Sequence, residues 1–324
     1  MPIHRREFLS IAAGVVGVTF TDPLRAVMTE KPLPIIDTHQ HLWDLVRYKP
    51  PWLSGANPKL AAKHDTSDYR KASAGLNLVQ AVYMEIDVAP EDQVKEADYV
   101  IELCNSQDHP TSAAVISGRP DSEQFASHIR RYQDNPYIKG VRRVLHADGA
   151  LPGLCLRPQF VKSMQLLGEM GMSFDLCMRP RELADGAALA GKCPDTNFIV
   201  DHCGNADPKA WMKNAPVKPA HTQDAWKRDI ASLAKRKNVV CKISGIVARA
   251  PQDWNAEHLA PIVDFCLDEF GPDRVMFGGD WPVCKLRATL GQWVNALKEI
   301  VSERPHFEQK LLFHDNARTF YGLS

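Results

Sequence analysis

Eight short apolar runs alternate with longer amphipathic stretches along most of this chain of 324 residues. Short runs rich in Val, Ile, Leu and Phe are typical of buried parallel strands, and the stretches between them have helical spacing. Repeated strand and helix units predict a parallel sheet covered by helices. The predicted strands are 33–37, 79–86, 113–116, 138–144, 173–177, 198–201, 239–243 and 275–277.

A helix is expected after each predicted strand. Several of these segments begin at Pro or after Asp or Ser, and Gly171 and Gly271 stand where helices commonly end. Eight such units predict a single (β/α)8 TIM-like barrel over 31–324, with a long first βα loop. A doubly wound open sheet is the alternative, but we find no Gly-rich phosphate loop that would favour it. The predicted helices are 68–76, 90–105, 122–133, 158–171, 180–191, 224–236, 256–270 and 290–302.

Two histidines follow the first strand at i and i+2. Side chains with this spacing project to the same face of an extended backbone, so His39 and His41 can meet at one point. A barrel presents the residues at its strand ends to one shared cavity, and here that set is rich in ionisable groups. It comprises His39, His41, Glu85, Asp87, Arg142, Arg143, His146, Asp175, Asp201, His202, Lys242 and Asp280.

Asp280 is the strongest candidate for a general base in this set. A carboxylate fixed at the end of the last strand can take a proton from water and return it to a leaving oxygen. Together with His39, His41 and His202, it could instead hold one divalent metal that lowers the pKa of bound water. Three imidazoles and a carboxylate suit zinc, with manganese as the second choice. Function without any metal stays open.

Charged strand residues supply the candidates for substrate binding. Arg142 and Arg143 are neighbours on one strand, so only one of them can face the barrel interior. Its planar guanidinium could bind a carboxylate or polarise a carbonyl. Lys242 lies in an apolar strand, where an unpaired charge would be costly, so a position at the cavity is expected. Glu85 could bind substrate, bind metal or pair with Lys242.

The segment 42–63 is aromatic and irregular, and it predicts a long first loop folded over the barrel mouth. Trp43 in this loop could contact substrate or simply cover the barrel. Trp281 and His146 complete the substrate-binding candidates, because they follow the last and fourth strands.

The charges of the chain balance, with 39 Lys and Arg against 39 Asp and Glu. No overall field would therefore draw the protein to nucleic acid or to an anionic membrane. A small molecule is the expected partner, and a homodimer is left open.

The N-terminus predicts an export signal over 1–30. An Arg5-Arg6 pair precedes an apolar segment that ends near Phe20 and is too short to span a membrane. This order resembles a twin-arginine signal, which exports folded proteins. The expected location is the periplasm or cell envelope, without stable membrane insertion once the signal is removed. A helix belonging to the fold is the alternative.

The eight cysteines match no zinc-binding spacing. Cys177, Cys203 and Cys241 lie in or beside predicted buried strands, and the number of cysteines for this length is far below that of a disulfide scaffold. We expect them to be small, reduced core residues.

Five sequence blocks are specific when taken together. They are DTHQHLWD at 37–44, GVRR at 140–143, DHCG at 201–204, FGGDWP at 277–282 and NARTFY at 316–321. These blocks resemble the amidohydrolase superfamily, and in particular its branch of metal-optional lactonases that act on sugar-acid and related dicarboxylate lactones. The resemblance implies a lactonase of the rhamnono- or fucono-lactonase type.

The same resemblance bears on the metal. Metal-dependent members of the superfamily usually add a carboxylated lysine or a glutamate on strand four, where this chain has Arg142 and Arg143. A binuclear site is therefore not expected. In metal-free members of the branch, the equivalent histidines would donate hydrogen bonds to the substrate carbonyl.

Two other functions compete with lactone hydrolysis. A related branch contains metal-dependent non-oxidative decarboxylases with a similar barrel, but Asp280-Trp281-Pro282 and Leu42-Trp43-Asp44 are closer to the lactonases. A non-catalytic exported carbohydrate-binding barrel is the third hypothesis. The intact set His39, His41, His202 and Asp280 disfavours it, because a binding module has no need of a base beside three imidazoles.

Overall fold

The computed structural model describes residues 32–106, 108–147 and 149–324. The predicted export signal lies outside the described residues. The segment Leu33–Ser324 forms a compact unit. Among the described residues, no helix combines the length and apolar character needed to cross a membrane.

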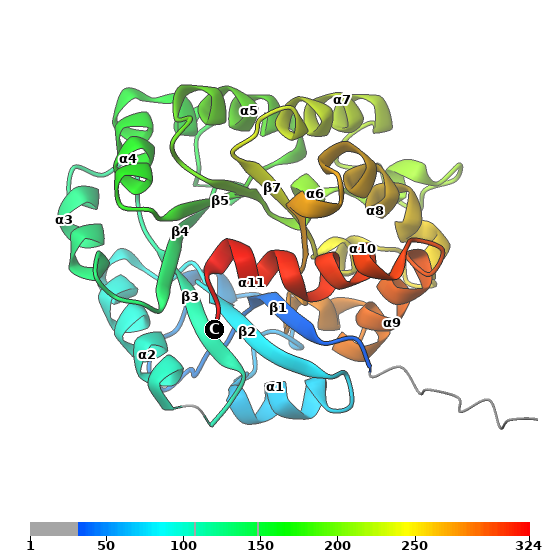
Figure 1. Cartoon of the computed structure of the whole chain (residues 1–324), viewed down its shortest axis with the longest axis horizontal. Helices are drawn as coiled ribbons and strands as arrows, with labels where there is room; N and C mark the ends of the chain where they lie inside the picture. The colour runs from blue at the N-terminus through cyan, green and yellow to red at the C-terminus, as the bar shows by residue number, and fades with distance from the viewer. Residues whose placement is uncertain (1–31, 107, 148) are drawn as a thin grey trace, which may run out of the picture. The chain divides into compact units, whose positions relative to one another are not determined.

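Eight parallel strands form one sheet in which each strand pairs with the next along the chain (Figure 1). Beyond the last strand, Gln40 forms a parallel bridge with Trp281, which brings the two edges of the sheet together. The predicted (β/α)8 barrel is thereby confirmed. The strands are β1 Ile35–Gln40, β2 Leu78–Met84, β3 Thr111–Ser117, β4 Ile138–Val144, β5 Ser173–Cys177, β6 Phe198–Val200, β7 Val239–Ile243 and β8 Val275–Phe277.

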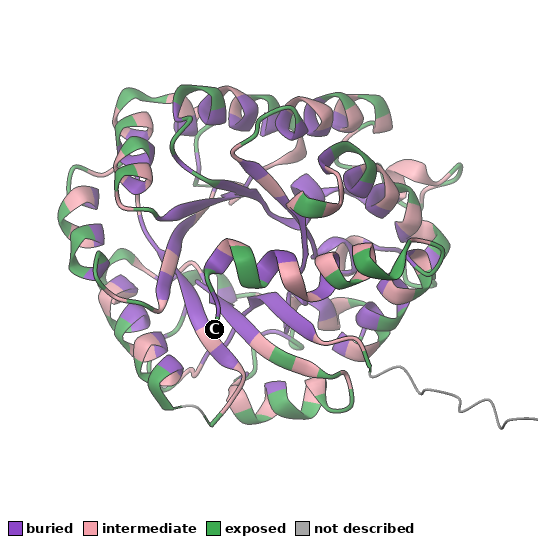
Figure 2. Cartoon of the chain, in the orientation of Figure 1, coloured by how far each residue is buried: buried purple, intermediate pink, exposed green. Residues whose placement is uncertain are grey.

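The helices surround the sheet, and the longer ones bury one face against it (Figure 2). The N-termini of α1, α8 and α9 are capped: Asp65, Asn255 and Thr289 each form a reciprocal capping box with the residue three positions later. The helices are α1 Thr66–Ser73, α2 Gln93–Ser106, α3 Phe125–Ile129, α4 Pro158–Glu169, α5 Leu183–Lys192, α6 His202–Asn205, α7 Gln223–Ala234, α8 Ala256–Phe270, α9 Leu290–Ile300, α10 His306–Lys310 and α11 Asn316–Tyr321.

The sequence pattern located these elements closely. The predicted bounds of β4, β5, β7, β8 and α8 are those of the structure. The predicted helix 122–133 is shorter in the structure, where α3 gives way to a 3-10 turn at Arg130–Tyr132. The C-terminal helices α10 and α11 were not predicted.

The C-terminal segment closes the end of the barrel at which the strands begin. Asn316 of α11 donates hydrogen bonds to the carbonyls of Pro272 and Val275, and Gln80 at the start of β2 donates to the carbonyl of Ser324. Tyr321 packs with the apolar side chains of the barrel interior. Figure 1 shows α11, in red, lying across this end of the sheet. The other end, where the strands finish, is left for a cavity.

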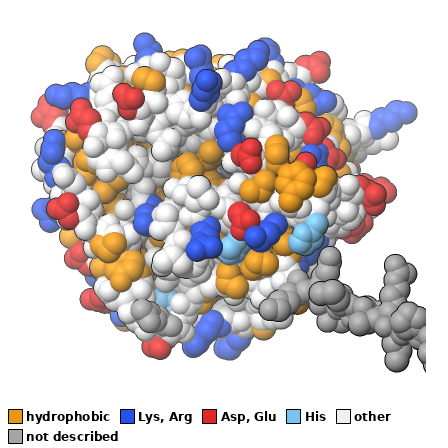
Figure 3. All heavy atoms as spheres, in the orientation of Figure 1, with side chains coloured by type: hydrophobic (Ala, Val, Ile, Leu, Met, Phe, Trp, Pro, Cys, Tyr) orange, Lys and Arg blue, Asp and Glu red, His pale blue; other side chains and the backbone are white. Residues whose placement is uncertain are grey.

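The displayed surface carries basic and acidic side chains intermingled with apolar ones, and no single-sign field dominates it (Figure 3). This distribution agrees with the net charge of +0.

Candidate active site

Asp37 joins the first and last strands and so fixes the position of the two histidines. Its buried carboxylate accepts hydrogen bonds from the backbone N–H of His39 at 2.9 Å and of Gly279 at 2.7 Å. A Cβ at Gly279 would collide with this carboxylate, so the contact requires glycine. The N–H of His41 donates to the carbonyl of Trp281 at 2.8 Å, which completes the junction.

The junction brings His39 and His41 to Asp280, as their strand-end positions predicted. The Oδ1 atom of Asp280 lies 3.5 Å from Nε2 of His41 and 3.9 Å from Nε2 of His39. Nδ1 of His41 is 2.9 Å from the carbonyl oxygen of Met84, so Nδ1 must carry the proton of a neutral imidazole. The lone pair on Nε2 then faces the carboxylate of Asp280.

Two acceptors facing each other at this distance need a positive charge between or beside them. A proton on Nε2 of His41 would supply it, and so would a metal cation. Single ligand atoms of His39, His41 and Asp280 all lie within 4.8 Å of one another, and two imidazoles with a carboxylate suit a divalent ion. The donor set therefore fits one metal. His202 belongs to a second such group, with His39 and Asp201.

Arg142 brings a fixed cation to the same place. Its Nη1 lies 3.2 Å from Nε2 of His39, while its Nε donates to Oε1 of Glu85 at 2.7 Å. A guanidinium can only donate, so Nε2 of His39 must accept, and the proton of His39 is on Nδ1, 3.4 Å from Asp201. Burial lowers the pKa of His39 well below its usual value, which keeps the ring neutral. Arg142 and a metal would thus compete for the lone pair of His39.

The two neighbouring arginines point in opposite directions, as strand geometry requires. Arg142 faces the barrel interior and lines the cavity. Arg143 forms an ion pair with Asp121, outside the cavity lining. The sequence made Arg143 a substrate-binding candidate, but its side chain is not placed to contact a ligand in the cavity.

Lys242 and Glu85 also lie away from the cavity lining. The ammonium of Lys242 contacts Asp175 and lies 3.6 Å from Oδ1 of Asp201, and all three residues are inaccessible to solvent. Burial opposes the charge on Lys242, but the two carboxylates outweigh it and raise its pKa. Lys242 was expected to contact the substrate, but from this buried position it does not reach the cavity lining. Glu85 pairs with Arg142 rather than with Lys242.

Asp201 is held ionised beneath His39. Burial raises the pKa of this carboxyl, yet the N–H of His39 and the ammonium of Lys242 beside it more than offset that effect and leave the pKa well below its usual value. Asp201, which Lys242 holds in place, therefore lies against Nδ1 of His39 and favours one orientation of that ring.

His202 stands beside His39, with 4.4 Å between ring centroids. Its Nδ1 is 2.9 Å from the hydroxyl oxygen of Ser244, and burial lowers its pKa. A Cβ at Gly245 would collide with the imidazole of His202, so glycine leaves the space that the ring fills. His202 is thus a neutral imidazole at the cavity wall.

Several residues at the ends of the strands adopt left-handed backbone conformations that side chains disfavour. The φ values are 51° for Asp87, 55° for His202, 51° for Cys203, 55° for Asn205 and 51° for Asp280. Such conformations cluster at functional sites, because the surrounding structure must hold them in place. Here all five follow β2, β6 or β8 on the same rim.

A cavity of about 570 Å³ opens above these groups. The first loop lines it with Trp43, Trp52 and Leu60, which agrees with the prediction that the loop folds over the mouth. Trp281 lies outside the lining, where it packs against His64 and Tyr69 with 5.3 Å between centroids, so its expected substrate contact disagrees with its position. Other apolar lining residues are Ile86, Val144, Val283 and Leu286.

His146 and Arg249 line the far wall of the cavity. His146 was a sequence candidate, and burial lowers its pKa to about 4, so it is neutral at neutral pH. Arg249 was missed, because it lies in a 3-10 turn after β7 rather than at a strand end. Its guanidinium donates to Oδ1 of Asn205 at 2.9 Å, and no carboxylate of the described residues lies within 4.0 Å of it. It is a cation available to a ligand.

A family model described as amidohydrolase matches residues 36–323. Among curated relatives, an uncharacterized protein of Sinorhizobium fredii is 28% identical over 309 residues, covering 90% of this chain and 99% of its own. An L-fucono-1,5-lactonase of Burkholderia multivorans is 26% identical over 298 residues, covering 89% of this chain and 96% of its own. The crystal structure of an amidohydrolase from Burkholderia multivorans with bound zinc has a TM-score of 0.76 at 24% identity, and the match covers 90% of this chain and 100% of that one.

Proposed function

Because the chain belongs to the amidohydrolase family, we propose that it is a hydrolase that opens the lactone ring of a sugar acid. The observation that carries this proposal is the position of Asp280, whose carboxylate lies 3.5 Å from His41 and lines the cavity. A lactone is a cyclic ester, and its hydrolysis needs a base for water, a polarised carbonyl and an acid for the leaving alkoxide. The lactonases among the curated relatives support the same substrate class.

Asp280 is the base and then the acid of this reaction. It accepts a proton from a water molecule in the cavity as the oxygen attacks the lactone carbonyl. The ring C–O bond of the tetrahedral intermediate then breaks, and Asp280 returns the proton to the departing alkoxide. The products are the open hydroxy acid and the unchanged enzyme.

Donors around the base stabilise the oxyanion that forms on the carbonyl oxygen. The hydroxyl of Ser244 can donate to Nδ1 of His202, which leaves an N–H on Nε2 to face the cavity. Arg142 adds a positive charge that Glu85 holds in place. Donors fixed before the reaction need no reorganisation when the oxyanion appears.

A divalent metal fits beside these groups, with zinc the first choice and manganese the second. His39, His41 and Asp280 would hold it, with His202 at the edge of the site. When bound, such an ion supplies a Lewis acid and lowers the pKa of coordinated water. The residues described above also provide a base and oxyanion donors without it.

The far wall of the cavity orients the substrate. Arg249 lacks an acidic partner among the described residues and can bind ring hydroxyls or a carboxylate of the lactone. His146 offers a neutral imidazole beside it. Trp43 and Trp52 supply flat apolar surfaces that suit the C–H face of a sugar ring.

The purified protein would be tested on a panel of 1,4- and 1,5-aldonolactones by following acid release in weak buffer. An identically purified His41→Ala sample controls for spontaneous opening and for contaminating esterases. At least one lactone should open faster with the wild-type protein. The proposal is wrong if none does, and carbon dioxide release from aromatic or unsaturated acids would favour the decarboxylase instead.

We also propose that residues 1–30 direct export to the periplasm or cell envelope. The Arg5-Arg6 pair and the apolar segment after it support this. Cell fractionation should find the wild-type protein outside the cytoplasm and the Arg5→Lys, Arg6→Lys double variant inside it. Equal distribution of the two would contradict the proposal.

A further inference from the structure

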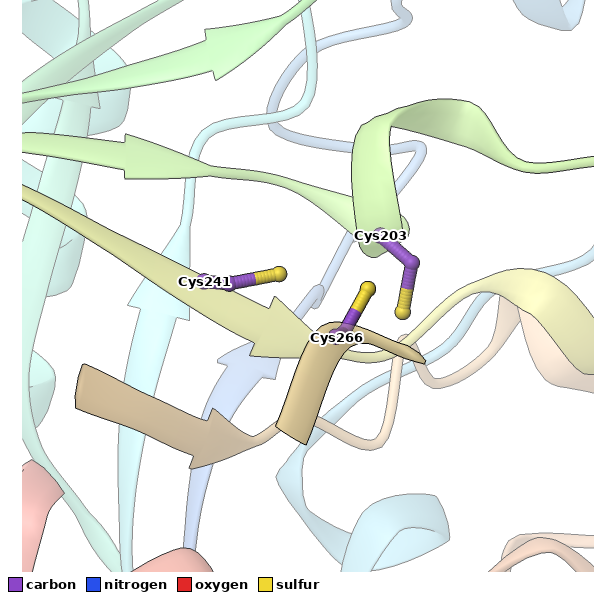
Figure 4. Close-up of side chains that lie close together, drawn as sticks. All are labelled: Cys203, Cys241 and Cys266. Carbon is purple, nitrogen blue, oxygen red and sulfur yellow. The ribbon is translucent and has the colours of Figure 1, made fainter. Parts of the chain in front are cut away.

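Three cysteines meet behind the active site. The Sγ atoms of Cys203, Cys241 and Cys266 all lie within 4.8 Å of one another, and each side chain is completely buried. Figure 4 shows them converging from the turn after β6, from β7 and from α8. The other described cysteines do not join any such group.

The cluster lies in the layer between the barrel wall and the outer helices. Side chains alternate along a strand, and Lys242 points into the barrel toward Asp175, so its neighbour Cys241 points outward. Cys266 lies on the buried face of α8, which packs against β7. Cys203 directly follows His202, so the cluster and the active site share one turn of the chain.

Packing alone does not require three thiols to meet. Within the cluster, Cys203 and Cys241 both direct their thiols to one acceptor, the carbonyl oxygen of Lys242, at 3.7 and 3.8 Å. These are long contacts to a shared oxygen, so they leave the sulfurs weakly satisfied as donors.

The sulfur positions suit a soft metal. A zinc-type ion binds thiolates at about 2.3 Å, which places three sulfurs roughly 4 Å apart. The sulfurs here need only a small inward movement to reach that spacing. We propose that Cys203, Cys241 and Cys266 form a three-sulfur site for a thiophilic ion of the zinc, cadmium or copper(I) class.

The all-sulfur set defines the class of ion. Oxygen-preferring ions such as Mg²⁺, Ca²⁺ and Mn²⁺ find no suitable ligand among three thiols. Each thiol that binds the ion releases its proton to solvent, so metal uptake by this site should depend on pH. Sequence spacing could not reveal it, because the ligands come from three separate elements.

Cadmium is the probe that tests this site. The metal-free protein would be titrated with excess Cd²⁺ and incubated for hours after each addition, since buried sulfurs become accessible only when the structure opens locally. A thiolate-to-cadmium charge-transfer absorption is expected, and its final amplitude should be that of one sulfur-bound cadmium per chain. The active-site residues His39, His41 and Asp280 cannot produce this band.

Serine variants locate the ion. Cys241→Ser and Cys266→Ser should each lose most of the absorption, while Cys104→Ser and Cys193→Ser, at buried positions outside the cluster, should keep it. If a cluster variant fails to fold, ¹¹³Cd NMR of the wild-type protein still reports whether sulfur or nitrogen and oxygen bind the ion.

Three results would overturn the proposal: no charge-transfer band, a band that survives in the cluster variants, or a ¹¹³Cd signal typical of nitrogen and oxygen ligands only. Loss of free thiols to a disulfide within the cluster, seen by mass spectrometry without reductant, would also overturn it. None of these readouts depends on lactone hydrolysis.

Discussion

Nε2 of His41 lies 3.5 Å from Oδ1 of Asp280, although the two residues belong to opposite ends of the barrel sequence. The contact exists because Asp37 joins the first strand to Gly279 and because the backbone of His41 binds the carbonyl of Trp281. The carboxylate of Asp280 and its imidazole neighbours therefore meet only when the barrel closes. The fold and the proposed chemistry depend on the same junction.

Replacing Arg142 by Gln should strengthen metal binding. The guanidinium lies 3.2 Å from Nε2 of His39, so it occupies the lone pair that a metal would use and repels the ion by its charge. A hydrogen bond from a charged group is worth about 1.5–3 kcal/mol, so freeing this lone pair should raise zinc affinity about tenfold or more. Competition with a chromophoric chelator measures it. Arg143→Gln, which alters the outward-facing neighbour paired with Asp121, is the matched control. If Arg142→Gln binds zinc equally or more weakly than the wild type, Arg142 does not compete with the metal for His39.

Arg249→Ala should weaken substrate binding. The loss of a charge-assisted hydrogen bond costs about 1.5–3 kcal/mol, so KM should rise roughly tenfold or more. Arg249→Lys should recover part of the loss. Arg181→Ala removes a nearby but largely exposed arginine and should leave KM unchanged. The substrate role of Arg249 fails if its alanine variant behaves like the Arg181 control.

Lys242→Met should destabilise the fold. The change leaves the carboxylate of Asp175 buried without its cation and removes one of the two cations beside Asp201, and breaking a buried pair in this way costs about 3–5 kcal/mol. The double variant Lys242→Met, Asp175→Leu should recover part of that stability, because it also removes one unpaired charge. Urea unfolding measures both. If the double variant is no more stable than Lys242→Met, the unpaired carboxylate of Asp175 is not the cause of the lost stability.

Acid should destabilise the protein partly through His146. Burial lowers the pKa of this side chain from 6.5 to about 4. Between those pH values the unfolded chain binds a proton that the native His146 does not, so stability falls as the pH drops below 6.5. This pKa difference corresponds to about 2 kcal/mol of stability at pH 5. The figure is an upper limit, because solvent screens a partly exposed side chain. Urea unfolding of His146→Gln should show a smaller loss between pH 7 and pH 5 than the wild type. If the wild type and His146→Gln lose the same stability between pH 7 and pH 5, His146 does not contribute to the acid destabilisation.

The sequence predicted the barrel because apolar periodicity reports directly on which faces are buried. The strand-end positions of His39, His41 and Asp280 followed from the same logic, since a barrel sends all its strand ends to one side. The choice between Arg142 and Arg143 needed the register of β4, which the pattern left open. Alternation along a strand predicted that only one faces inward, but it could not say which.

Other parts of the site depend on contacts between distant segments. Lys242 looked like a cavity residue because a lone lysine in a strand is costly, but Asp175 on β5 and Asp201, which directly follows β6, satisfy it beneath the site. Arg249 reaches the cavity through a 3-10 turn whose shape no periodicity encodes. Trp281 follows Asp280, the proposed base, yet its side chain turns away to pack against Tyr69.

The most direct test of the account compares kcat/KM of the wild-type protein and Asp280→Asn on the lactone that opens fastest. Asparagine keeps the shape of the side chain but cannot accept the proton of water, so kcat/KM should fall by about 10²–10⁴. Asp121→Asn, which changes a carboxylate outside the cavity lining, should keep the wild-type value, and equal melting temperatures would exclude unfolding as the cause. Wild-type activity in Asp280→Asn would contradict the assignment of this carboxylate as the base.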